Sequence, residues 1–236
     1  MSFRHVIALA ALFGAGSLMA QESAALAAAN APTAAPAAAP AALKPGDANA
    51  GQSKAAACGA CHGIDGNPAS SQYPKLAGQH ETYIARQIEL FKTNKRQSPI
   101  MMGFAMPLSD QDMHDIGAYF AAKSSLPGVA DAKLTAKGEA LYRGGDKATD
   151  TPACMACHGP DGRGNPGAGY PQLAGQYADY VAQKLKDWRD GKKWSDDDKG
   201  AIMPAVVHGL NDNDIAALAT YIEGLHGAGS GNTAAK

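Results

Sequence analysis

Apolar residues along this chain recur at the spacing of helices. In QHETYIARQIELF, a stripe is formed by Tyr83, Ile84, Ile88 and Phe91, as expected when one face of a helix is buried. No alternating pattern of useful length suggests a strand. Further amphipathic segments cover residues 48–57 and 135–142. We therefore predict an all-α fold.

A helix is also expected to begin after Ser109, which has the character of an N-cap. Asp112 follows three residues later, as in a capping box, and Met113, Ile116 and Phe120 then supply a buried face. A later segment shows the same order of cap, acid and apolar residues: Asn211, Asp214, Ile215, Leu218 and Ile222. The same local plan is therefore used twice.

The repetition extends over most of the chain. CGACHGIDGNP returns as CMACHGPDGRGNP, YPKLAGQHETYIARQIELF as YPQLAGQYADYVAQKLKDW, and IMMGFAMPLSDQD as IMPAVVHGLNDND. The first residues of these three pairs are displaced by 96, 97 and 102 positions, so the register drifts by only a few loop residues. We predict two domains of one fold, residues 47–130 and 131–236.

The beginning of the chain has a different composition. Residues 1–20 run from a basic start through an apolar stretch to small residues, which is typical of a secretory signal peptide. Cleavage is expected near Ala20, with a buried helix or an uncleaved anchor as the alternatives. Residues 21–46, rich in Ala and Pro, are expected to form a semi-extended linker. The mature protein is therefore predicted to be periplasmic, where free thiols do not persist.

Composition and charge narrow the function. The formal net charge of the 236 residues is -1, and residues 47–131 and 132–236 each sum to -1, so no basic surplus for binding nucleic acid exists. Aromatic residues make up only 6% of the chain, which leaves little bulk for two cores. A bulky apolar group from outside the sequence would supply it.

The four cysteines all belong to two C-x-x-C-H motifs, which contain Cys58, Cys61 and His62, then Cys154, Cys157 and His158. A structural zinc site needs cysteine pairs closer in sequence, and a thioredoxin-like pair needs a βαβ context. Both of these, and a plain disulfide, leave the histidines without a role. Covalent haem attachment uses every residue, because two thiols can bind one porphyrin while the adjoining imidazole reaches its iron. Two covalently bound haem c groups are predicted.

The sixth ligand of each iron should recur in both repeats. Met101 and Met203 do so, each seven residues before a leucine, whereas Met102 and Met106 have no counterpart. Histidine could take this place instead, but none of the candidates has a repeated histidine: His80, His114, His208 and His226. Surface or capping roles are expected for these four. We predict methionine as the second axial ligand.

These motifs together resemble class I cytochrome c domains, and their duplication resembles the dihaem cytochrome c4 family, over about residues 47–226. The resemblance implies Cys58, Cys61, His62 and Met101 for the first haem and Cys154, Cys157, His158 and Met203 for the second. It also implies that the backbone carbonyls of Pro74 and Pro171 accept hydrogen bonds from the ligand histidines. Gly51 and Gly138 resemble the small residues at which the first and last helices cross, near Tyr119 and Tyr221.

The family implies a function without enzymatic catalysis. It indicates a periplasmic monomer that carries single electrons from a bc1-type complex or a dehydrogenase to a terminal oxidase, with peripheral membrane association if the signal is retained. Two alternatives stay open. One is a dihaem redox enzyme of the peroxidase or thiosulfate-oxidising type, and the other is a fixed electron-transfer subunit of a larger dehydrogenase or oxidase complex.

Overall fold

The computed structural model describes residues 43–226, which form ten helices. The predicted signal peptide, residues 1–20, and nearly all of the predicted linker lie outside the described residues. The helices are α1 (Ala48–Lys54), α2 (Gly59–His62), α3 (Glu81–Lys92), α4 (Pro99–Ala105), α5 (Asp110–Ala121), α6 (Ala132–Gly144), α7 (Met155–His158), α8 (Ala178–Arg189), α9 (Asp198–Val207) and α10 (Asp212–Gly224).

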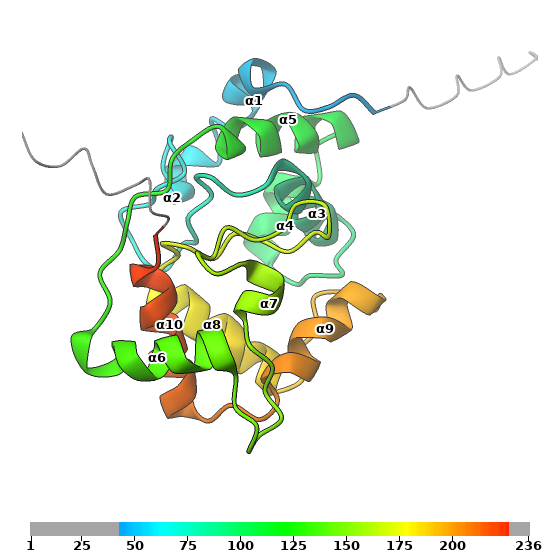
Figure 1. Ribbon diagram of the computed structural model, residues 1–236. Helices are drawn as coiled ribbons and strands as arrows, with labels where there is room; N and C mark the ends of the chain where they lie inside the picture. The colour runs from blue at the N-terminus through cyan, green and yellow to red at the C-terminus, as the bar shows by residue number, and fades with distance from the viewer. Residues whose placement is uncertain (1–42, 227–236) are drawn as a thin grey trace, which may run out of the picture. The chain divides into compact units, whose positions relative to one another are not determined.

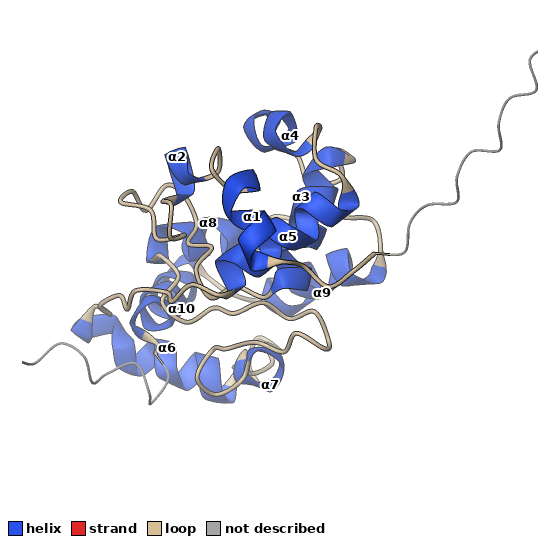
Figure 2. Ribbon diagram, turned by 90° about the horizontal axis from the view of Figure 1, so that it is seen from above, coloured by secondary structure: helices blue, strands red, loops and turns tan. Residues whose placement is uncertain are grey.

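The helices pack as two sets of five, which we call the first lobe (α1–α5) and the second lobe (α6–α10). In the first lobe α5 packs against α1 and α3, and in the second α10 packs against α6 and α8 (Figure 1). Between residues 43 and 226 only isolated β-bridges occur, and no strand (Figure 2). The all-α prediction is confirmed. None of the helices described is long and apolar enough to cross a membrane.

Each lobe places a glycine where its first helix crosses its last. A Cβ atom on Gly51 would lie 2.0 Å from the carbonyl oxygen of Asp115, and one on Gly138 would lie 2.2 Å from that of Ala217. Backbone atoms cannot move aside as a flexible side chain can. The close crossing of α1 with α5 and of α6 with α10 therefore requires a residue without a side chain.

Both last helices begin with a capping box, as the sequence indicates. The Ser109 hydroxyl accepts from the backbone N–H of Asp112, whose carboxylate accepts from the Ser109 backbone N–H. Asn211 and Asp214 make the same reciprocal pair at α10. Each box satisfies helix N–H groups that have no partner within the helix, so it fixes where the last helix starts.

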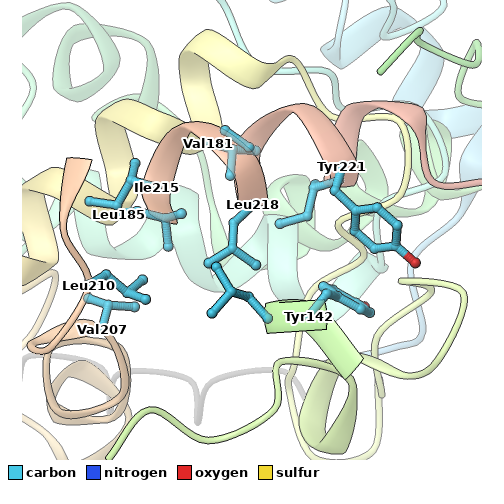
Figure 3. Close-up of a cluster of buried hydrophobic side chains, with 11 residues drawn as sticks. Tyr142, Val181, Leu185, Val207, Leu210, Ile215, Leu218 and Tyr221 are labelled. Atoms are coloured by element: carbon cyan, nitrogen blue, oxygen red, sulfur yellow. The ribbon is translucent and has the colours of Figure 1, made fainter. Parts of the chain in front are cut away.

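Each lobe has its own apolar core beneath the last helix. In the second lobe Tyr142, Ile215 and Leu218 are almost fully buried, at 0%, 0% and 1% exposure, among Val181, Leu185, Val207, Leu210 and Tyr221 (Figure 3). The first lobe buries Met113, Ile116 and Phe120 in the same way. Burial of one such side chain contributes about 1.5–3 kcal/mol. These contacts hold the last helix against the loops that carry the two motifs.

Candidate functional site

The two C-x-x-C-H motifs each form a single helical turn. Helix α2 follows Cys58 and contains Cys61 and His62, and helix α7 follows Cys154 and ends at His158. Because each turn is helical, its two thiols and its imidazole are held within one short segment. No disulfide joins any of the four cysteines, all of which lie within residues 43–226.

A backbone carbonyl orients each motif histidine. The Nδ1 atom of His62 lies 2.9 Å from the carbonyl oxygen of Pro74, and that of His158 lies 3.0 Å from that of Pro171. Since a carbonyl can only accept, Nδ1 carries the proton in both rings and Nε2 has its lone pair free for a metal. Burial lowers the pKa of both histidines, although the hydrogen bonds to the carbonyls oppose this. The neutral, metal-binding form is therefore favoured.

A cavity of about 1070 Å³ joins the two motifs. His62 and His158 line it, and so do the repeat-related Met101 of α4 and Met203 of α9. Much of the remaining lining is apolar, including Leu76, Ile88, Phe91, Phe120, Val181, Leu185, Val207, Leu210 and Ile222. The ligands predicted from the sequence thus line one largely apolar cavity, and the volume and apolar lining of this cavity suit porphyrin groups.

The four other histidines within residues 43–226 lie outside the lining of this cavity. The Nδ1 atom of His114 lies 2.9 Å from a carboxylate oxygen of Glu81, while His208 and His226 bond to nearby backbone carbonyls. His80 differs, because its Nε2 lies 2.8 Å from the carbonyl oxygen of Arg163 in the other lobe. His114, His208 and His226 thus make only local surface contacts, whereas His80 also connects the two lobes.

The thiols do not have the properties of the competing sites. Burial raises the pKa of the Cys58 thiol, and raises that of Cys154 to about 11. Redox-active C-x-x-C pairs lower the pKa of a thiol instead. Within residues 43–226, no group of three or more His, Cys, Asp or Glu side chains is placed to hold a metal ion. The thioredoxin-like and zinc interpretations therefore gain no support.

The lobes meet through reciprocal glutamine contacts, which the sequence patterns did not assign. Gln176 accepts from the backbone N–H of Lys75 (3.0 Å) and donates to the carbonyl of the same residue (3.0 Å). Gln79 does the same with Gln172, at 3.0 Å and 2.9 Å. Both glutamines end the repeated motif LAGQ, and this repetition was the only available signal. We call these four residues the lobe junction.

A cation–π contact adds a second connection between the lobes. The guanidinium of Arg96 lies 3.5 Å from the ring centroid of Trp194 in the second lobe and 4.6 Å from that of Phe91 in its own. It also donates to the Tyr180 hydroxyl at 3.0 Å. Arg96 has no arginine at its repeat counterpart, so a search for repeated residues could not find it.

The donor set fits covalent haem. Each lobe brings two adjacent free thiols and a neutral imidazole to a largely apolar cavity, which is the arrangement that c-type haem attachment requires. The fold and site thus define the class of c-type cytochromes with two haem domains. In agreement, the family model described as Cytochrome c matches residues 48–122 and 135–226.

Named relatives give the particular family. Cytochrome c4 of Pseudomonas aeruginosa is 51% identical over 181 residues, which cover 77% of this chain and 90% of that protein. The crystal structure of reduced cytochrome c4 from Pseudomonas stutzeri shares 46% identity with a TM-score of 0.73, covering 77% of this chain and 100% of that one. A thiosulfate dehydrogenase electron acceptor of Stutzerimonas stutzeri A1501 is 34% identical over 71% of this chain and 78% of its own length.

The chain belongs to the cytochrome c4 family. It carries two covalently bound haem c groups, one at Cys58 and Cys61 and the other at Cys154 and Cys157, as predicted. Its function is electron transfer, and the prediction that it is a carrier and not an enzyme is confirmed by these relatives.

Proposed function

We propose that each haem iron is held between a histidine and a methionine, with His62 and Met101 in the first lobe and His158 and Met203 in the second. One observation carries this proposal: the two repeat-related methionines line the same cavity as the two oriented histidines. Met102 and Met106 are outside that lining, and Met106 is 56% exposed.

The haem supplies one-electron exchange at iron, and the chain supplies a fixed environment for it. The carbonyls of Pro74 and Pro171 accept the Nδ1 proton of each ring and so fix its orientation. A histidine with a methionine raises the reduction potential of haem iron and leaves no position for a substrate. The thioethers and the apolar lining keep the ligands in place, which suits outer-sphere electron transfer.

The proposed setting is the periplasm, with single electrons passing from a bc1-type complex or a dehydrogenase to a terminal oxidase. The signal-like residues 1–20 and the cysteines committed to haem support export. The proposed form is a freely exchanging monomer, which could associate peripherally with a membrane if the signal is retained.

A donor of the thiosulfate dehydrogenase type is a second candidate. The observation that favours it is the 34% identity to a protein named as the electron acceptor of that enzyme. Stopped-flow mixing of the oxidised protein with a reduced thiosulfate dehydrogenase or a reduced bc1 complex would separate the two donors. The physiological donor should reduce the protein much faster than the other.

Replacement of Met203 by Ala tests the ligand assignment. We expect the sulfur-to-iron absorption band of one haem to disappear, and that haem alone to bind carbon monoxide or cyanide rapidly, because its sixth position has lost the thioether. Met101→Ala should give the same result at the other haem. Absorption spectra of both oxidation states measure the outcome.

Met106→Ala is the matched control, since Met106 is exposed and lies outside the cavity lining. It should keep both sulfur bands. An unchanged spectrum after Met203→Ala would remove Met203 from the iron. Rapid uptake of carbon monoxide by the unaltered protein would contradict ligand saturation.

A further inference from the structure

The peptide that orients each histidine also takes part in the lobe junction. The carbonyl of Pro74 accepts from His62, and the N–H of the same peptide unit, which belongs to Lys75, donates to Gln176 of the second lobe. One amide therefore connects a histidine of the first lobe to a side chain of the second.

The other lobe repeats this connection in reverse. The carbonyl of Pro171 accepts from His158, and the N–H of the same peptide unit, which belongs to Gln172, donates to Gln79 of the first lobe. Each glutamine oxygen also accepts a backbone N–H from its own chain neighbour, at 3.0 Å from His80 and 3.1 Å from Tyr177. Because these bonds fix which amide atom is oxygen, the glutamines are held as acceptors toward the two peptides.

Hydrogen bonds in such a chain strengthen one another. An acceptor at the N–H of a peptide polarises the unit and makes its carbonyl oxygen more negative. A more negative oxygen accepts a stronger bond from the histidine, which raises the basicity of the imidazole. A more basic imidazole stabilises ferric iron and lowers the reduction potential of the haem to which it is bound.

We propose that Gln176 of the second lobe lowers the reduction potential of the first haem, and that Gln79 of the first lobe lowers that of the second. The two glutamines are positioning residues that act through the Pro74 and Pro171 peptides. The inference rests on the proposed function, in which His62 and His158 bind the irons. It makes the potential of each haem depend on a side chain from the opposite lobe.

Replacement by methionine, which is similar in size but cannot bond to the backbone as the amide does, provides the test. Gln176→Met should raise the potential of the first haem, by about a threefold change in its reduction equilibrium, or about 28 mV at 59 mV per tenfold for one electron. The second haem should change much less. Gln79→Met should raise the potential of the second haem and change that of the first much less. Each variant therefore tests the proposal independently if the other folds poorly.

The measurement must distinguish the haems. Haem methyl resonances in the NMR spectrum of the oxidised protein, assigned with Met101→Ala and Met203→Ala, follow each centre through a redox titration. In the reduced protein the Nδ1 proton of His62 should move upfield in Gln176→Met, because its hydrogen bond is weaker. A role limited to lobe packing would not shift that proton selectively.

Gln172→Met is the matched control for a glutamine lost at the same junction. Within residues 43–226 the Gln172 side chain makes no hydrogen bond, and its backbone groups remain in the variant. It should change the potential of either haem less than the two test variants do.

The outcomes separate the inference from the function on which it rests. Equal shifts of both haems, or a larger shift in the lobe that carries the substitution, would overturn the crossed dependence while both sulfur bands persist. Absence of those bands from the unaltered protein would overturn the ligand assignment and the inference together.

Discussion

In both lobes a tyrosine hydroxyl bonds to the backbone just after the C-x-x-C-H turn, but the tyrosine belongs to a different helix in each lobe. In the first lobe the hydroxyl of Tyr119, on the last helix α5, donates to the carbonyl of Ile64 at 2.7 Å. In the second lobe the hydroxyl of Tyr142, on the first helix α6, donates to that of Gly159 at 2.7 Å. Both bonds secure the chain just after a C-x-x-C-H turn. The fold therefore requires a donor at this place and leaves its origin free.

A second contrast lies in the third helix of each repeat. Leu90 is buried at 4% exposure in the first lobe, whereas the position corresponding to it holds Asp187, at 9% exposure. The carboxylate of Asp187 accepts from Lys184 and Lys192, both at 2.7 Å, and from Gln183 at 2.9 Å. A buried charge is tolerated only when partners satisfy it, so one lobe uses an apolar contact where the other uses a set of charges.

Because the two cores are alike, the free energy of unfolding should depend equally on the central core residue of each lobe. Ile116 and Leu218 are repeat counterparts, each 1% exposed. Ile116→Ala and Leu218→Ala should each lower the free energy of unfolding by about 2–5 kcal/mol, because a buried cavity remains. Denaturant unfolding followed by circular dichroism and haem absorption measures the loss. Ile64→Ala, at a site 79% exposed, is the control. A loss as small as that of the control in either lobe would break the equivalence of the cores.

The helix crossing should be equally strict in both lobes. Gly138→Ala and Gly51→Ala each place a methyl group against backbone, and each should cost about 1–3 kcal/mol or more in thermal unfolding. Gly144, on the same helix as Gly138, has open space around its Cβ position. Gly144→Ala should therefore be neutral or slightly stabilising. Equal costs at Gly138 and Gly144 would show that the close crossing is not what requires glycine.

The charged site should make the stability contributed at this position depend on acid in the second lobe but not in the first. Burial opposes ionisation of Asp187, but its bonds from Lys184, Lys192 and Gln183 prevail and lower its pKa from 3.8 to about 2. A carboxylate with a lowered pKa in the folded state contributes stability above about pH 4, which is lost as the pH falls toward 2. Asp187 should contribute on the order of 1–2 kcal/mol in this way.

Asp187→Leu copies the first lobe and should make the second lobe less sensitive to acid between pH 4 and 2. Unfolding temperatures across that range measure the slope. Leu90→Met is a control that adds no charge and should leave the slope unchanged. The same slope in Asp187→Leu as in the unaltered protein would remove this carboxylate as the source of the difference.

Much of the site followed from local patterns in the sequence. The C-x-x-C-H turns, the capping boxes at Ser109 and Asn211, and the buried stripes depend on residues a few positions apart, which the geometry of a helix alone brings together. The repeat then singled out Met101 and Met203. Contacts between lobes had no such local signal: Gln79 and Gln176 were visible as a repeated letter, but not their partners about 100 residues away.

The sequence by itself determined the helical class, the duplication, the thiol pairs and the imidazole beside each pair, because short-range spacing fixes all of these. Only the tertiary structure decided that both motifs share one cavity, that His80 joins the lobes, and that each glutamine of the lobe junction reaches the peptide behind the opposite histidine. Such contacts depend on how two folded surfaces meet, and no periodicity along one chain encodes that fit.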